Sequence, residues 1–164
     1  MPPATATSRD MSELLQDGAD LEPMSLPTIT RATLALFAGA SGDHNPIHID
    51  IDAARAAGLG DVIAHGMLSM AYVSRYVLQW VPQQALRSLD VRFAAVTPVL
   101  ATPVCSGQVR RVEEQDGRRV VELDLAVRLS DGTVTVTGSA VVELDDADAP
   151  AGASYAETLG EGDA

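Results

Sequence analysis

Hydrophobic positions divide the chain into segments of different periodicity. Residues 30–40 and 52–58 each show a short helical pattern, the first ending before a glycine. In residues 67–80 apolar side chains occupy nearly every side of a helix, and such a helix must be buried on most of its faces. Pro82 ends this helix, because proline cannot continue the backbone hydrogen bonding. We therefore expect one buried central helix preceded by two short ones.

Beyond the proline, the spacing of apolar residues switches from a helical period to a period of two. The segments with this strand pattern are residues 89–93, 104–112, 121–129 and 133–144. Turn residues, including Asp131-Gly132, separate the later strands and favour hairpins. A buried helix followed by a run of antiparallel strands predicts an α+β fold whose sheet wraps around the helix.

The second short helix has clear start and stop signals. Asp52 is the expected N-cap, because a carboxylate there can accept hydrogen bonds from the first free N–H groups. Gly58 is the expected stop signal after the last helical turn.

The length of 164 residues allows one domain, which we place at residues 26–144. The composition, with 46% hydrophobic and 21% charged residues, is that of an ordinary soluble globular protein. Most of the net charge of −12 lies at the two ends of the chain. We expect residues 1–25 to be a mobile segment and residues 145–164 to be an acidic, disordered tail. A basic surface that would bind nucleic acid is not predicted.

The sequence also bears on location. A single cysteine, Cys105, excludes an internal disulfide and any metal site built from several cysteines. The first residues lack the basic and apolar regions of a signal peptide. The longest apolar segment, residues 67–81, contains polar residues and is too short to span a bilayer. We therefore expect a cytoplasmic protein without a membrane partner.

The most informative segment for function is Ser41-Gly42-Asp43-His44-Asn45-Pro46-Ile47-His48. Pro46 disfavours helical geometry at Asn45 and cannot donate a ladder hydrogen bond, so this segment is expected to be an ordered loop. An acid and an imidazole on either side of a rigid turn can both be directed at one water molecule. General acid–base catalysis requires such an arrangement, and Asp43 and His48 are therefore the candidate catalytic pair.

Three segments carry a resemblance to a known family. Residues 37–50, FAGASGDHNPIHID, resemble the signature of the MaoC-like, (R)-specific enoyl-thioester hydratases. Residues 63–68, IAHGML, resemble the start of the central helix in that family. Residues 91–99 are similar to the mycobacterial (3R)-hydroxyacyl-ACP dehydratase β-subunits. The resemblance covers residues 29–144, and its first motif is specific because several residue types recur at fixed offsets.

The resemblance implies a hotdog fold, a dimer and the reversible hydration of a trans-2-enoyl thioester. The substrate would be carried on coenzyme A or on acyl carrier protein, and the dimer would be a homodimer or a heterodimer with a related hotdog subunit. It also implies that Asp43 and His48 hold one water between them. Which of the two is the formal base, the acyl chain length, the carrier and the pathway stay open at this stage.

Gly66 is the third candidate catalytic residue. Hydration passes through an enolate-like state, and the free N–H groups at a helix N-terminus can stabilise the charge on the thioester oxygen. A glycine there lets the substrate approach the backbone closely. Asn45, Ser74 and Met67 are the expected supporting or substrate-binding residues, with Asn45 fixing the loop. No cofactor is expected, and no metal site, because the pair lacks a third ligand at a suitable spacing.

Two other functions compete with the hydratase. A hotdog thioesterase would use the same fold, but such enzymes generally carry a carboxylate on the central helix, and residues 67–80 contain none. The chain could also be one subunit of a heterodimeric dehydratase, in which an active half pairs with a degenerate one. The intact Asp43 and His48 would then make it the active half.

Overall fold

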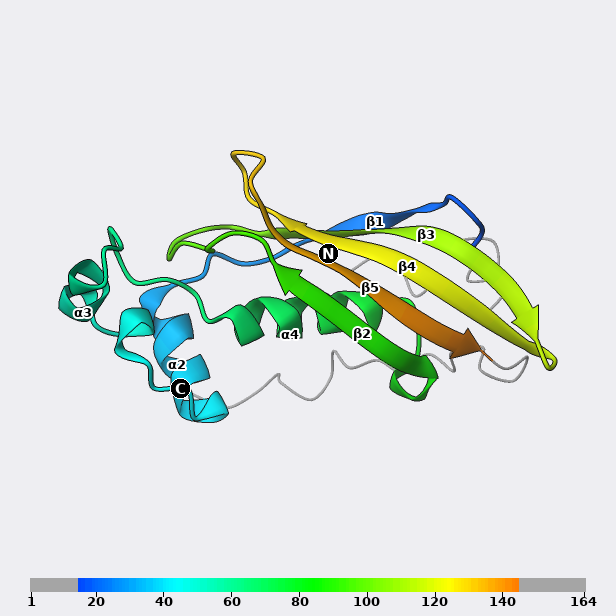
Figure 1. The fold of residues 1–164 in the computed structure, drawn as a ribbon, viewed down its shortest axis with the longest axis horizontal. Helices are drawn as coiled ribbons and strands as arrows, with labels where there is room; N and C mark the ends of the chain where they lie inside the picture. Colours follow the sequence, from blue (N-terminus) through cyan, green and yellow to red (C-terminus); the bar gives the residue numbers. More distant parts are fainter. Residues whose placement is uncertain (1–14, 145–164) are drawn as a thin grey trace, which may run out of the picture.

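The computed structural model describes residues 15–144, in which a five-stranded antiparallel sheet wraps around one helix (Figure 1). The helices and strands are β1 (Asp20–Ser25), α2 (Arg31–Ser41), the 3₁₀ turn η1 (Pro46–His48), α3 (Ile51–Ala56), α4 (Gly66–Val77), the 3₁₀ turn η2 (Gln83–Ala85), β2 (Leu86–Phe93), β3 (Val104–Gln115), β4 (Arg118–Arg128) and β5 (Val134–Leu144). This confirms the predicted α+β class with a sheet around a central helix.

The sheet has the strand order β1-β3-β4-β5-β2, so β1 and β2 form its two edges. Strands β3 and β4 are joined by a two-residue turn in which Asp116 and Gly117 both have positive φ angles, of 52° and 77°. Two consecutive residues of positive φ match the twist of a hairpin, and Asp-Gly adopts them at low cost. The sequence of residues 115–117 therefore explains this connection.

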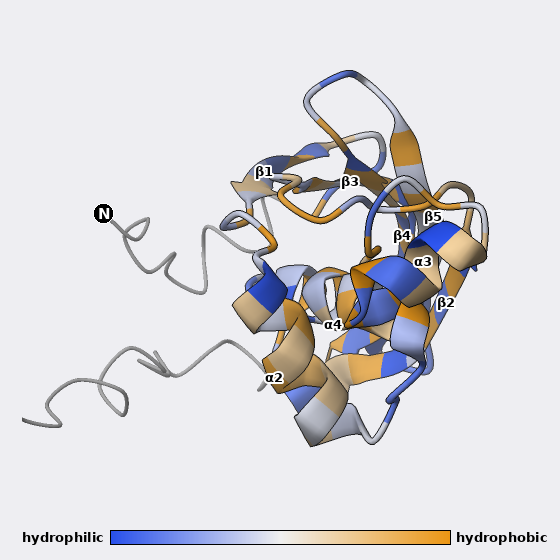
Figure 2. Ribbon diagram, turned by 90° about the vertical axis from the view of Figure 1, so that its left-hand side faces the viewer, coloured by the Kyte–Doolittle hydropathy of each residue, from blue (hydrophilic) through white to orange (hydrophobic). Residues whose placement is uncertain are grey.

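Helix α4 lies along the concave side of the sheet. Viewed from the end that carries α2 and α3, the strands curl around it, with β1 and β3 above and β2 and β5 beside it (Figure 2). Val73, Tyr76 and Val77 of α4 are almost fully buried in the main core, which the inward residues of all five strands complete. The Tyr76 ring packs where Gly107 of β3 leaves room, since a Cβ at that glycine would lie 3.0 Å from it.

The domain begins earlier in the chain than the sequence predicts. Residues 20–25 were expected within a mobile segment, but they form β1, which pairs with β3. Leu15 and Leu21 are 1% and 3% exposed and belong to the main core. Residues 15–25 therefore belong to the domain, while the expected mobile residues 1–14 and acidic tail 145–164 lie outside the described residues.

The helices follow the predicted positions with two corrections. Helix α4 starts at Gly66, one residue before the predicted segment 67–80, and ends at Val77, before the predicted end near residue 80. The N-cap of α3 is Asp50 and not Asp52, because the carboxylate of Asp50 accepts from the N–H groups of Asp52 and Ala53. Two aspartates in sequence both fit the capping pattern, and only the backbone geometry of residue 50 distinguishes them. Among residues 15–144, every helix is too short or too polar to span a lipid bilayer.

Candidate active site

The loop between α2 and η1 is shaped by short-range hydrogen bonds. Helix α2 ends at Ser41 and is capped by Gly42, whose φ of 75° is left-handed and favours glycine. The backbone N–H of Asn45 donates to Oδ1 of Asp43 at 3.2 Å, so Asp43 makes the local turn that aspartate favours in loops. The side-chain oxygen of Asn45 in turn accepts from the N–H of Ile47 and caps the 3₁₀ turn η1. Both side chains of Asp43 and Asn45 are exposed.

The turn η1 carries His48 into the protein, where its side chain is only 8% exposed. Its Nδ1 lies 2.8 Å from the carbonyl oxygen of Ile63. A carbonyl oxygen can only accept, so we assign the proton to Nδ1, and Nε2 is left with its lone pair free. The backbone N–H of Ile63 also donates to the carbonyl of Ile47, which fixes η1 against the segment before α4.

The segment before α4 is held from its other side by an ion pair. Arg31 of α2 donates to both carboxylate oxygens of Asp61, at 2.8 and 2.7 Å. The N–H of Val62, followed by the Arg31 guanidinium, holds the pKa of the Asp61 carboxyl below its usual value. This pair is exposed to water, so its effect on stability is small.

Asp43, His48 and His65 come together although they lie up to 22 positions apart. A carboxylate oxygen of Asp43 and one ring nitrogen from each histidine lie within 4.8 Å of one another. The two imidazole rings are stacked, with centroids 3.9 Å apart and planes inclined by 27°. The expected pair of acid and imidazole therefore shares one environment, and a second, fully buried histidine lies beside it.

His65 supplies the third potential ligand that was not found from the sequence, so the lack of a third ligand was a wrong reason to expect no metal site. The stacking of the two rings is the observation that argues against one. A zinc ion bonds to imidazole nitrogens at about 2.0–2.1 Å, along lone pairs that lie in the ring planes. Nearly parallel planes 3.9 Å apart do not converge on one point at that distance. The geometry instead suits hydrogen bonding to a small molecule.

The N-terminus of α4 lies beside this cluster. In the described part of the chain, the backbone N–H groups of Gly66 and Met67 make no hydrogen bond, and the N-cap residue, His65, does not cap the helix with its side chain. These donors are available to a ligand. The ring of Phe93, at the end of β2, lies over Gly66: a Cβ on that glycine would come within 3.2 Å of it.

A pocket of about 440 Å³ opens at this place. Its lining comes from η1, the start of α4, the end of β2 with the loop after it, and β5: His48, Ile63, Ala64, Gly66, Ser69, Phe93, Ala94, Ala95, Val96, Thr97, Thr135 and Val136. A slightly larger hollow of about 470 Å³ lies over β1, β3 and β4, but it holds no histidine and no helix N-terminus. The pocket with His48 and Gly66 is therefore the candidate active site.

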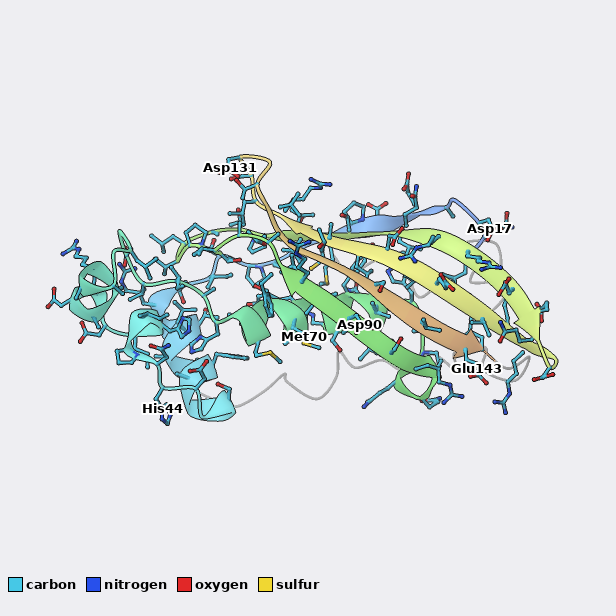
Figure 3. All side chains as sticks on the ribbon, viewed as in Figure 1. Asp17, His44, Met70, Asp90, Asp131 and Glu143 are labelled. Atoms are coloured by element: carbon cyan, nitrogen blue, oxygen red, sulfur yellow. The ribbon has the colours of Figure 1, made fainter. Side chains whose placement is uncertain are left out.

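The predicted site residues divide into those at the pocket and those outside its lining. His48 and Gly66 line it, and the carboxylate of Asp43 reaches His48 from the adjoining loop. Ser74 and Met67 are not among the lining residues; Ser74 is half-buried farther along α4, and Met67 is 54% exposed. His44 points away from the domain (Figure 3).

Sequence reasoning missed three residues of the site. His65 is not among the predicted site residues, yet its ring stacks on His48. It did not consider Ser69, which is 3% exposed and lines the pocket where Ser74 was expected. It treated Phe93 as an ordinary strand residue. The helical spacing puts Ser69 one turn after Gly66, which is the signal that could have identified it.

Comparison with known proteins agrees with this geometry. The family model described as "MaoC like domain" matches residues 17–132. The 3-hydroxyacyl-thioester dehydratase Z of Mycobacterium tuberculosis is 33% identical over 130 residues, which span 76% of this chain and 77% of the relative.

Two solved structures resemble this one. The (R)-hydratase from A. caviae involved in PHA biosynthesis superposes with a TM-score of 0.69 at 25% identity, covering 79% of this chain and 97% of that chain. A chain of the ChsH1-ChsH2 complex from Mycobacterium tuberculosis gives the same TM-score and identity and covers 79% of this chain and 98% of that one. Their fold is that of the present chain.

Proposed function

Since the chain belongs to the MaoC-like domain family, we propose that it catalyses the reversible hydration of trans-2-enoyl thioesters to (R)-3-hydroxyacyl thioesters. It is then a hydro-lyase, equally described as a 3-hydroxyacyl-thioester dehydratase. The observation that carries the proposal is the meeting of Asp43 and His48 beside the free N-terminus of α4. Each step of a hydration has a suitable group there.

The attacking water would lie between Asp43 and His48. Two hydrogen bonds of about 2.8 Å from one water can bridge acceptors up to about 5.6 Å apart. One carboxylate oxygen of Asp43 and one ring nitrogen of His48 are at most 4.8 Å apart, which falls within that reach. Both groups can accept from the water, since Asp43 is a carboxylate and Nε2 of His48 has a free lone pair.

We assign the proton transfer to His48 and the orientation of the water to Asp43. As the water oxygen bonds to Cβ, Nε2 of His48 takes one of its protons, and the alkene electrons move toward the thioester oxygen. The same proton then returns to Cα, which gives the 3-hydroxyacyl thioester and restores the neutral ring. Imidazole is suited to this relay because it changes charge near neutral pH.

The thioester oxygen would accept from the backbone at Gly66. The N–H groups of Gly66 and Met67 are free in the described chain, and the positive end of the α4 dipole reinforces them. Removal of one comparable donor in an enzyme costs about 3–4 kcal/mol of transition-state stabilisation. This contribution is as large as that of the acid–base pair.

A hotdog thioesterase is less well supported. Helix α4 carries no aspartate or glutamate along Gly66–Val77, so a carboxylate nucleophile or base on the central helix is absent from the described chain. The relatives compared above are named as dehydratases and hydratases. Hydration therefore accounts for the site better than hydrolysis does.

The assembly and the carrier belong to the proposal as well. We infer a homodimer, with a heterodimer of two hotdog subunits as the alternative, because one structural neighbour is a chain of the ChsH1-ChsH2 complex. The substrate would be an acyl-CoA or an acyl-ACP thioester. A cytoplasmic location stays a prediction from the sequence.

The decisive experiment incubates the purified chain with crotonyl-CoA and follows the loss of the conjugated enoyl absorbance. We expect hydration, and chiral chromatography of the product should show the (R)-3-hydroxy thioester. Enoyl thioesters of increasing chain length, offered on both carriers, would then define the substrate. Failure to hydrate any of them would contradict activity of the isolated chain. Release of free coenzyme A without hydration would instead indicate a thioesterase.

A further inference from the structure

His65 is a buried titratable residue that the proposed hydration does not use. Its side chain is 0% exposed, and it occupies the N-cap position of α4. A side chain at that position usually satisfies a free N–H group of the helix, yet His65 makes no such bond. Helix capping therefore does not explain why a histidine is buried there.

The contacts of His65 go to the two proposed catalytic residues instead. Its Nε2 lies 3.1 Å from the backbone carbonyl oxygen of Asp43. One face of its ring stacks on His48 at a centroid distance of 3.9 Å, and Phe37 of α2 packs at 5.0 Å with its plane tilted by 56°. One side chain thus contacts both members of the pair and is itself supported by α2.

The hydrogen bond identifies the tautomer of His65. The carbonyl of Asp43 can only accept, so the proton is on Nε2 and Nδ1 carries the lone pair. This Nδ1 is buried and makes no hydrogen bond in the described chain. The proton of His65 is thus engaged with a backbone oxygen and His65 is not among the residues that line the pocket, so we assign it no acid–base role.

The Asp43 loop needs such a contact. The other hydrogen bonds of Asp43 in residues 15–144 are local: its N–H donates to Ser41 Oγ at 3.3 Å, and its carboxylate accepts from Asn45. Both are exposed to water, whereas the bond from His65 ties the loop to the segment before α4. A misplacement of about 1 Å in a catalytic group can cost about 100-fold in rate.

We propose that His65 is a positioning residue that holds Asp43 through its Nε2–H and His48 through its ring face. The inference rests on the proposed hydratase function. It assigns two separable tasks to one side chain, donation to a backbone oxygen and aromatic support. Two substitutions divide these tasks, because His65→Gln keeps a donor near the place of Nε2 and His65→Phe keeps the ring without the donor.

The kinetic test compares H65Q and H65F with the matched substitutions H44Q and H44F at the exposed neighbouring histidine. We expect kcat for crotonyl-CoA hydration to fall about 10–100-fold in both His65 variants, with KM changed less than about threefold. The His44 variants should stay within about twofold of the wild type. The inference would be overturned if kcat fell equally in the His65 and His44 variants, or if it did not fall in the His65 variants.

A double substitution separates positioning from a general structural role. If His65 acts on Asp43 through its Nε2–H, then H65F, which keeps the ring but loses the donor, should lower kcat by less than about threefold in an enzyme that already carries D43N. A full, multiplicative loss in the double variant would show that His65 acts independently of Asp43. Thermal unfolding of each variant shows whether its fold is intact.

An activity-independent measurement completes the test. Long-range ¹H–¹⁵N NMR distinguishes the two imidazole tautomers, and the chain has only three histidines to assign. We expect the Nε2–H tautomer for His65, and an Nδ1–H tautomer would contradict the hydrogen bond on which the inference depends. An inactive wild type would overturn the proposed function and this inference together. An active wild type with unaffected His65 variants would overturn only the inference.

Discussion

At the scale of single residues, the site combines an exposed carboxylate with buried rings. The Asp43 side chain is exposed, while His48 and His65 are buried. The two proposed catalytic residues are therefore held by different means, Asp43 by loop hydrogen bonds and His48 by its bond to Ile63 and its stacking. Substitution of the exposed member should affect chemistry without affecting stability.

We predict that Asp43→Asn lowers the hydration rate by about 10²–10⁴-fold, because the amide cannot accept from the water as the carboxylate does. The melting temperature should change by less than about 3 °C, since an exposed side chain of similar shape is retained. Enzyme kinetics and thermal unfolding of the same sample check both statements. Asp116→Asn, in the β3–β4 turn, is the matched control. Loss of the fold with little kinetic effect would assign Asp43 a structural role.

Burial also controls the single cysteine. Desolvation raises the pKa of the Cys105 thiol to about 11 from its ordinary value of 9.0. The unfolded chain loses this proton at a lower pH than the folded chain does. The free energy of unfolding therefore decreases as pH rises from about 9 to about 11. Below about pH 9 both the folded and the unfolded chain keep the thiol proton, so the thiol causes no loss of stability there.

Urea unfolding at about pH 8 and about pH 10.5 tests this linkage. The wild type should lose more stability between the two conditions than Cys105→Ala does. Burial also raises the pKa of Tyr76, to about 12, so the variant should keep part of the alkaline loss. Equal losses in the two proteins would mean that the thiol is not protected.

The sequence predicted that Asp43 and His48 lie together, but it did not predict the residues around them. Asp43 and His48 lie in one short motif, where the residue types and the proline reveal an ordered loop. His65 and Phe93 reach the same place from distant segments, and their ring contacts depend on how η1, α4 and β2 pack. No local pattern encodes such contacts, so only the tertiary structure identifies these residues.

At the scale of helices and strands, segments with a strong apolar period were predicted correctly, whereas strand β1, which has no clear period, was not predicted. Helix α4 and the long strands β3, β4 and β5 have clear apolar periods. Strand β1 has only six residues, DLEPMS, and includes Pro23. It is an edge strand, and proline is tolerated at such an edge, so the residue that argues against a strand is compatible with one there.

The pairing of β2 with β5 depends on a close backbone approach. Gly138 of β5 faces Val91 of β2, and a Cβ at residue 138 would lie 2.5 Å from the backbone oxygen of Asp90. We predict that Gly138→Ala destabilises the protein by about 1–3 kcal/mol, because a backbone atom cannot move aside cheaply. Chemical unfolding measures the change.

Gly39 is the matched control for this substitution. It lies in helix α2, where a Cβ would meet nothing within 4 Å. Gly39→Ala should therefore be neutral or stabilise the protein by up to about 1 kcal/mol. The same small effect at Gly138 would mean that β2 and β5 are farther apart than the structure places them.

At the scale of the whole molecule, one edge of the sheet and the pocket share an exposed apolar surface. Strand β2 is an edge strand and ends at Phe93, which is 50% exposed. Val96 and Met67, nearby in the loop after β2 and at the start of α4, are 50% and 54% exposed. An open strand edge beside apolar side chains is a typical place for association with another chain.

We therefore expect the purified chain to form a dimer in which β2 and its surroundings are covered. Native mass spectrometry should give twice the 17.2 kDa of one chain. Replacing Phe93 and Val96 together with serine should shift the population toward the single chain, whereas serine at the exposed Leu36 of α2 should not. A wild type that stays a single chain at micromolar concentration would favour a heterodimer with another subunit.

The ring of Phe93 over Gly66 links this association to turnover. The same side chain lies over Gly66, whose backbone is the proposed donor to the thioester, and ends the strand expected at the subunit boundary. If the subunits separated, the Phe93 ring could shift, and the backbone N–H groups at the start of α4 would be exposed to bulk water. Specific activity should then decrease on dilution, and added crowding protein of unrelated sequence should not restore it.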